Sequence, residues 1–165
     1  MKRVAIFTSL TLALTVLLLA SGVAIAAVIN GTGGSDDLRG TRGEDKIRGF
    51  AGNDRIDGGR SADLIFGGAN ADVIYGFYGK DRIFGEAGND IIEAGPDGDR
   101  VSGGPGRDEI NAGPGNDRVD IADGQFDSLS CGTGNDIATV DDADLSRQSF
   151  EDFVRLTSCE NVIVE

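Results

Sequence analysis

Residues 103–111 read Gly-Gly-Pro-Gly-Arg-Asp-Glu-Ile-Asn, and variants of this nine-residue unit run through most of the chain. Its Asp recurs every nine residues without a slip, at Asp36, Asp45, Asp54, Asp63, Asp72, Asp81, Asp90, Asp99, Asp108 and Asp117. Two residues after each Asp comes an aliphatic side chain: Leu38, Ile47, Ile56, Ile65, Ile74, Ile83, Ile92, Val101, Ile110 and Val119. A repeat of this regularity determines the architecture, because each nine-residue unit forms the same structural unit and successive units stack on one another.

The residue types within the unit predict the path of the chain. A β-branched residue between polar neighbours favours a strand of three residues with one side chain pointing inward. The six residues between strands, such as 49–54, are rich in Gly and suit a tight turn with positive φ angles. Two units then make one coil of about 18 residues, and the coils stack as parallel strands. We therefore expect an all-β fold, a parallel β-roll in which inward aliphatic side chains from two sheets meet.

Stacking the coils also aligns the Asp residues in two columns. Alternate repeats place their turns on opposite edges, so Asp36 and Asp54 begin one column and Asp45 and Asp63 the other. Neighbouring carboxylates would lie about 4.8 Å apart and repel each other strongly unless a cation bridges them. Turn carbonyls can complete an all-oxygen shell, which calcium prefers. The repeats contain neither His nor Cys, so zinc and copper would lack their usual ligands.

These residues resemble the RTX family of calcium-binding nonapeptide repeats, Gly-Gly-x-Gly-x-Asp-x-U-x with U a large aliphatic residue. Residues 103–111 match every defined position, and the resemblance extends from Gly31 to Val119. It implies a right-handed β-roll in which Asp side chains and turn carbonyls of consecutive coils hold each calcium ion. The ten Asp residues would then serve up to eight sites. Ser61 replaces a repeat Gly, and because Ser tolerates a left-handed backbone poorly, we expect weaker calcium occupancy near it.

The first 26 residues are typical of a Sec-type signal peptide. Met1-Lys2-Arg3 is basic, an apolar run follows from Val4 to Ala20, and Ala24-Ile25-Ala26 supplies a cleavage site for export. The alternative is an uncleaved membrane anchor, since the apolar run is long enough to span a bilayer. Cleavage after Ala26 would leave a secreted chain with a charge of about −15, against −13 for the whole sequence.

Residues 123–165 are expected to form a C-terminal cap on the roll, which we assign to residues 27–122. The repeat slips by one residue and resumes at Asp127 and Asp136, two further candidate calcium ligands. Cys131 and Cys159 are the two cysteines, and an exported chain would join them in a disulfide; the alternative is two free buried thiols. We expect the last strand at 161–164 and a short helix at 150–156.

No catalytic site is recognisable, and we do not predict an enzyme. The sequence has no His, which excludes Ser-His-Asp and Cys-His chemistry. Carboxylate pairs can hydrolyse glycosides, but the repeat already accounts for the aligned Asp residues. The net charge of −13 argues against a nucleic-acid partner, and we expect no membrane association after signal cleavage.

A set of apolar side chains is left over beside the strands and in one turn, and exposed apolar patches often mark partner sites. Phe66 and Phe84, 18 residues apart, should stack on one sheet face, Tyr75 lies on the other face, and Phe77 and Tyr78 lie in the intervening turn. This set predicts a surface for a protein or glycan partner; the alternative is that the N-terminal strand, the cap or a second copy covers it.

The primary hypothesis for the whole chain is extracellular calcium binding with calcium-induced folding after export. The alternative is a cell-surface adhesion or glycan-binding module in which calcium is structural.

Overall fold

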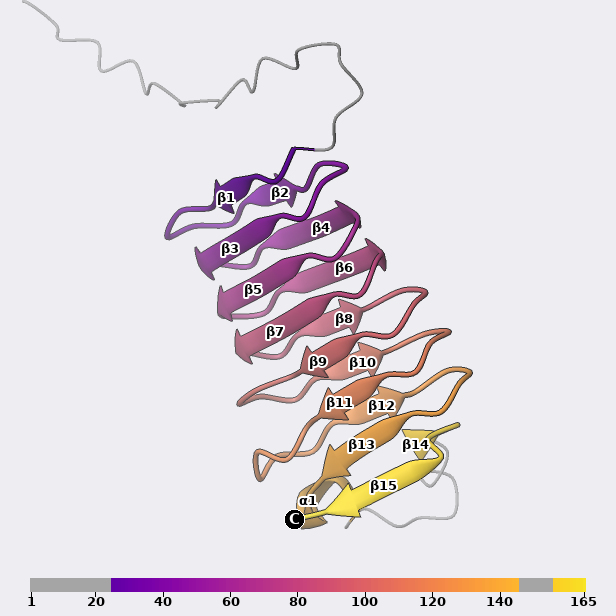
Figure 1. Ribbon diagram of the computed structural model, residues 1–165. Helices are drawn as coiled ribbons and strands as arrows, with labels where there is room; N and C mark the ends of the chain where they lie inside the picture. The colour runs from indigo at the N-terminus through magenta and orange to yellow at the C-terminus, as the bar shows by residue number, and fades with distance from the viewer. Residues whose placement is uncertain (1–24, 146–155) are drawn as a thin grey trace, which may run out of the picture.

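The computed structural model describes residues 25–145 and 156–165, which form a flattened solenoid of parallel strands (Figure 1). Strands alternate between two sheets. Sheet A has the order β1-β3-β5-β7-β9-β11-β13-β15 and lies in front in Figure 1, and sheet B has the order β14-β12-β10-β8-β6-β4-β2. The fold class expected from the nine-residue repeat, an all-β two-sheet solenoid, is therefore confirmed.

The strand bounds are as follows. Sheet A contains β1 (Val28–Asn30), β3 (Lys46–Ala51), β5 (Leu64–Ala69), β7 (Arg82–Ala87), β9 (Arg100–Ser102), β11 (Arg118–Asp120), β13 (Ile137–Val140) and β15 (Asn161–Val164). Sheet B contains β2 (Asp37–Arg39), β4 (Arg55–Arg60), β6 (Val73–Tyr78), β8 (Ile91–Glu93), β10 (Glu109–Asn111), β12 (Ser128–Ser130) and β14 (Leu156–Thr157). One short helix, α1 (Asp142–Leu145), is present in the described part of the chain.

The core is a double stack of aliphatic side chains, one from each strand. Ile47 pairs with Ile65 and Ile65 with Ile83, so each side chain lies directly above its counterpart in the next coil. Six successive isoleucines are completely buried: Ile47, Ile56, Ile65, Ile74, Ile83 and Ile92. Burying one such side chain contributes about 1.5–3 kcal/mol, so the thin core is a substantial source of stability despite the scarcity of aromatic residues.

Strand length differs from the expectation. The strands β3 to β7 have six residues each, whereas β2 and β8 to β12 have the expected three. The longer strands continue past the glycine that follows the inward aliphatic, because Phe50 pairs with Gly68 and Gly68 with Glu86 in the neighbouring coils. The turns in this part of the roll are correspondingly shorter.

The second and third Gly positions of the repeat both have a left-handed backbone in the units from Asp54 to Asp99. Ser61, Asn70 and Asp97 stand in for the third Gly of their units and have φ values of 79°, 81° and 89°. Phe50, Phe77 and Glu86 stand in for the second Gly, with φ values of 80°, 67° and 72°. A side chain with a β-carbon is strained in this region, since it crowds the following carbonyl oxygen.

Replacing Glu86 with Gly is therefore expected to stabilise the folded protein by roughly 0.5–1 kcal/mol, the relief of left-handed strain less the entropy of an added Gly. The matched control is Glu93→Gly, at an exposed strand position that is not left-handed, where a loss of similar size is expected. Urea unfolding of both variants in saturating calcium measures the difference. A stability loss in Glu86→Gly equal to that in Glu93→Gly would contradict the strain argument.

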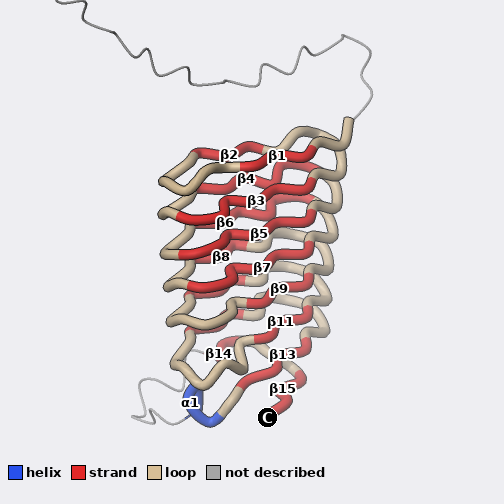
Figure 2. Tube along the Cα trace, turned by 90° about the vertical axis from the view of Figure 1, so that its left-hand side faces the viewer, coloured by secondary structure: helices blue, strands red, loops and turns tan. Residues whose placement is uncertain are grey.

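At the C-terminal end, seen at the bottom of Figure 2 next to the helix α1, strands β12 to β15 continue the two sheets. Strand β15 occupies residues 161–164 and pairs with β13, and a disulfide joins Cys131 to Cys159. Both predictions are confirmed. Ala138, which breaks the column of large aliphatics, nevertheless pairs with Val119 and is fully buried. The one-residue slip is absorbed in the turns before β12 and β13, and the strands themselves stay in register.

Two other expectations fall mostly outside the described residues. Of the helix expected at 150–156, residues 150–155 are not described, and Leu156 begins the strand β14. Nearly all of the expected signal peptide, residues 1–24, is likewise outside the described range. Within the described residues, no helix has the length and apolar character needed to span a bilayer.

Candidate metal centre

Two columns of aspartates line the two edges of the roll, where the turns stack in Figure 2. In each column the backbone N–H of one Asp donates to Oδ1 of the Asp in the next coil, as from Asp72 to Asp90 and from Asp81 to Asp99, both at 2.8 Å. The first column contains Asp36, Asp54, Asp72, Asp90, Asp108 and Asp127. The second contains Asp45, Asp63, Asp81, Asp99, Asp117 and Asp136. The structure thus aligns all twelve predicted ligand residues.

The second carboxylate oxygen distinguishes ten of these residues. Their Oδ2 atoms are buried and have no hydrogen-bond partner: Asp54, Asp63, Asp72, Asp81, Asp90, Asp99, Asp108, Asp117, Asp127 and Asp136. These side chains are at most 4% exposed. A buried carboxylate oxygen without a donor is costly, and ten of them in two rows call for a compensating positive charge.

Asp36 and Asp45, at the start of the columns, are different. Their Oδ2 atoms accept hydrogen bonds from the backbone N–H groups of Thr32, at 2.6 Å, and Thr41, at 2.5 Å. Thr32 and Thr41 stand four residues before the Asp, and neither has a positive φ. In the units from Asp54 to Asp117 the equivalent residue is left-handed, and Oδ2 has no donor. In these units, an Asp has an Oδ2 atom without a donor where the residue four positions before it is left-handed.

The environment of the columns raises the carboxylate pKa values well above the ordinary 3.8. Burial is the main cause, and the neighbouring carboxylates of the same column add to it, while the hydrogen bond from the backbone N–H opposes both. The pKa rises to about 7 for Asp63 and Asp72 and to about 8 for Asp99 and Asp127. A bound cation would reverse this penalty, because it favours the ionised form.

The glycines next to the columns leave room for oxygen atoms to converge. A β-carbon on Gly85 would lie 2.5 Å from both Asp90 Oδ2 and the carbonyl oxygen of Gly103. A β-carbon on Gly67 would likewise lie 2.6 Å from Asp72 Oδ2 and 2.7 Å from the Gly85 carbonyl oxygen. A carboxylate oxygen and a carbonyl oxygen from the next coil thus face one space beside Gly67 and Gly85, whereas Ala94 and Ala112 occupy this position in the units of Asp99 and Asp117.

This donor set fits calcium. In the described residues no three carboxylate or cysteine side chains converge on one point, so backbone carbonyls would have to complete any metal shell. A shell of carboxylate and carbonyl oxygens with no nitrogen or sulfur suits a hard cation with many ligands. The columns would supply the carboxylates, and the Gly-rich turns the carbonyls.

Acid is expected to stabilise the calcium-free roll. A carboxylate whose pKa is higher in the folded state favours folding below its unfolded pKa, near 3.8, and this contribution is lost as pH rises through the folded values of about 6 to 8. Circular dichroism in EDTA should therefore show more β-structure at pH 4.5 than at pH 8. In saturating calcium the trend should reverse, because protons then compete with the ion. More β-structure in EDTA at pH 8 than at pH 4.5 would contradict the raised pKa values.

The first column continues beyond the predicted residues. Asp127 N–H donates to Asp144 Oδ1 at 2.9 Å, so Asp144 in helix α1 takes the next position. Its Oδ2 accepts the N–H of Asp141, and it therefore lacks the free oxygen of the other members. Carboxylates also replace turn carbonyls here: Gly106 N–H donates to Asp123 Oδ2, whereas Gly88 N–H donates to the Pro105 carbonyl. The irregular spacing of 17 residues hid Asp144 from the repeat pattern.

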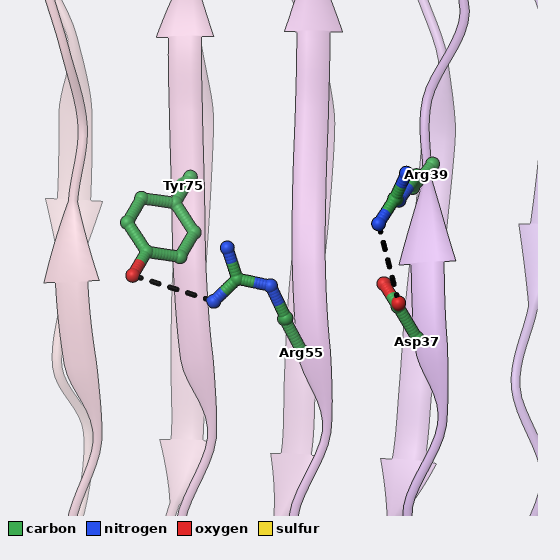
Figure 3. A network of polar contacts seen from close by, with 4 residues as sticks. All are labelled: Asp37, Arg39, Arg55 and Tyr75. Atoms are coloured by element: carbon green, nitrogen blue, oxygen red, sulfur yellow. Dashed lines mark hydrogen bonds and ion pairs between the residues drawn. The ribbon is translucent and has the colours of Figure 1, made fainter.

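The predicted apolar side chains lie on the two sheets as the spacing of 18 residues indicated. Phe66 and Phe84 stack on sheet A with ring centroids 5.2 Å apart, and both are half-buried. Tyr75 lies on sheet B, where the Arg55 guanidinium covers its ring at 4.6 Å and donates to its hydroxyl at 3.4 Å (Figure 3). Phe77 and Tyr78, at the end of β6, are 42% and 58% exposed. The five side chains do not form one continuous patch.

These features define a class, a two-sheet parallel β-solenoid with aspartate columns in its turns. A family model described as the RTX calcium-binding nonapeptide repeat matches residues 30–65, 58–92 and 93–125. These spans cover more than half of the chain, which belongs to this family, as its sequence resemblance indicated. Comparisons with curated proteins and with solved structures found no match. Membership in the family implies calcium as the bound ion.

Proposed function

We propose that the two aspartate columns bind calcium ions between successive coils and that the roll is completed by them. The observation that best supports this proposal is the set of ten buried Oδ2 atoms that have no hydrogen-bond partner. The ligands would be these oxygens together with turn carbonyls such as that of Gly103. Asp36 and Asp45 would be the weakest members, because Thr32 and Thr41 already donate to their Oδ2 atoms.

The proposed physiological setting is outside the cell. Proteins with RTX repeats are typically secreted, and the disulfide between Cys131 and Cys159 indicates an oxidising environment. We assign residues 1–26 to a signal peptide, 27–122 to the calcium-binding roll and 123–165 to the cap. Extracellular calcium sites commonly have dissociation constants of about 10⁻⁴–10⁻³ M. Calcium would then be too scarce inside the cell to fill the columns, and folding would follow export.

We propose no enzymatic role. The RTX roll is a structural calcium-binding fold. The buried carboxylates have a structural explanation in the metal columns, and the sequence offers no His to act as a general base.

Equilibrium dialysis of residues 27–165 against calcium tests the proposal. Several calcium ions should bind per chain in the submillimolar range, with magnesium failing to compete at equal concentration, because magnesium requires a tighter octahedral shell. Binding of no more than one calcium ion per chain would refute the columns as calcium sites.

A further inference from the structure

The outer faces of the two sheets carry opposite charge. We consider the residues on either side of the inward side chain in each strand. On sheet A these positions hold five cations, Lys46, Arg48, Arg82, Arg100 and Arg118, and the single carboxylate Asp120. On sheet B they hold four carboxylates, Asp37, Asp57, Glu93 and Glu109, and two cations, Arg39 and Arg55. In a chain with a net charge of −13, a basic face is unexpected and needs a reason.

Three of the arginines form a row across adjacent strands, which we call the arginine row: Arg82, Arg100 and Arg118. Arg82 pairs in register with Arg100, and Arg100 with Arg118, so their backbones are about 4.8 Å apart. All three are exposed. Of the residues that the structure describes, only Arg39 and Asp37 form an ion pair within 4.0 Å, on the other sheet (Figure 3). Like charges stacked this closely repel each other unless an anion is shared between them.

Grooves flank the arginine row on both sides. One, of about 690 Å³, is lined by the three arginines and Lys80 and also by the carboxylates of Asp81, Asp97 and Asp99. The other, of about 340 Å³, is lined by the same arginines with Phe84, Thr139 and the carboxylate of Asp120. The row therefore runs along the solenoid axis between two shallow depressions, a shape that fits a linear chain better than a flat surface.

The aromatic side chains on this face hold cations in place. The Arg48 guanidinium lies 5.5 Å from the Phe66 centroid and Lys46 Nζ 5.9 Å from it, while Arg82 lies 6.0 Å from the Phe84 centroid. The two rings stack on each other with an angle of 11° between their planes. Because their faces are thus occupied, they offer no platform on which nucleic-acid bases could stack. A guanidinium on an aromatic face keeps its N–H edge free to donate to anions.

We propose that the outer face of sheet A binds an acidic polysaccharide, with the arginine row donating to its carboxylate or sulfate groups. Guanidinium groups match such oxyanions in a bidentate manner. A sugar ring is about as long as the spacing between strands, so anionic groups on every ring can face successive arginines, and those on alternate rings, as in hyaluronate, can face Arg82 and Arg118. Calcium in the aspartate columns removes much of the repulsion between the acidic chain and a polyanion, and binding therefore requires the calcium-loaded roll.

The test compares two variants with the same change of charge. Arg82, Arg100 and Arg118 are replaced together by Gln on sheet A, and Arg39, Arg55 and Arg60 are replaced together by Gln on sheet B as the control. Biolayer interferometry in calcium measures binding to hyaluronate, dextran sulfate, uncharged dextran and a single-stranded oligonucleotide. Hyaluronate and dextran sulfate separate carboxylate from sulfate recognition. Circular dichroism and equilibrium dialysis check that each variant retains the roll and its calcium.

The wild type should bind at least one acidic polysaccharide and not uncharged dextran. The sheet A variant should bind at least about ten-fold more weakly, and the sheet B variant like the wild type. Equal weakening in both variants, no binding of the wild type to either acidic polymer, or tighter binding to the oligonucleotide would each overturn the proposal. Equilibrium dialysis against calcium shows whether the metal sites are intact, so a failure of polysaccharide binding can be told apart from a failure of calcium binding. If the triple variant loses the roll, Arg100→Gln alone, with Arg39→Gln as its control, gives the same comparison.

Discussion

Replacing Asp81 with Asn is expected to weaken calcium binding on both sides of its turn by at least about ten-fold, because each site loses a full negative charge at close range. The Asn side chain keeps an oxygen to accept the Asp63 N–H, now 2.8 Å from Asp81 Oδ1. Its amide nitrogen takes the place of Oδ2, which faces the carbonyl oxygen of Ala94 across the space beside Gly76. The amide can donate to that carbonyl, whereas a carboxylate oxygen repels it.

The same substitution is therefore expected to leave the calcium-free roll no less stable, or slightly more stable, than the wild type. This opposite effect on the two states separates a metal ligand from a residue that merely supports the fold. Isothermal titration with calcium measures the first effect, and the amount of β-structure seen by circular dichroism in EDTA measures the second. Asp120→Asn, an identical change at an exposed position on sheet A, is the control and should leave calcium binding unchanged. Unchanged calcium stoichiometry and affinity in Asp81→Asn would exclude Asp81 as a ligand.

Removing the disulfide is the second change with a large expected effect. The bond joins residues 28 apart in sequence, and closing a loop of this length stabilises a protein by about 3–4 kcal/mol in the chain-entropy model. It also ties the turn after β12 to the segment between β14 and β15, the last strands of both sheets. The variant with both Cys131 and Cys159 replaced by Ala should therefore lose about this much stability in calcium, with the cap fraying before the roll.

Denaturant unfolding with and without a reductant supplies the control. The wild type should lose stability on reduction, whereas the double variant should be insensitive to the reductant. Hydrogen exchange should show the loss of protection at β14 and β15 before that at β5 and β7. A double variant that unfolds at the same denaturant concentration as the oxidised wild type would show that the disulfide does not stabilise the cap.

The repeat made the fold and most of the candidate site predictable. A strict period of nine residues fixes which side chains point inward, so the buried isoleucines, the two sheets and the two Asp columns all follow from spacing. The six-residue strands did not follow, because pairing beyond the Gly after each inward aliphatic depends on contacts with the next coil. The separate status of Asp36 and Asp45 goes with a β-branched Thr at the second Gly position, since Phe50, Phe77 and Glu86 at the same position are left-handed and their units keep the free Oδ2.

The degenerate end of the roll was harder to predict. Asp144 joins the first column at a spacing of 17 residues, through a helix that no repeat pattern indicates. The charge difference between the sheets depends on side chains that the repeat leaves variable. It becomes visible only when residues 18 apart are placed on the same face, as Arg82, Arg100 and Arg118 are.

Circular dichroism of residues 27–165 during a calcium titration, with magnesium as the control, tests the metal-completed roll most directly. Without calcium, ten buried carboxylate oxygens without partners and a thin core should leave the chain poorly ordered at neutral pH. Calcium should then induce a cooperative increase in β-structure that magnesium does not reproduce. A chain that is already β-rich in EDTA and does not respond to calcium would contradict this account, and the aspartate columns would need another explanation.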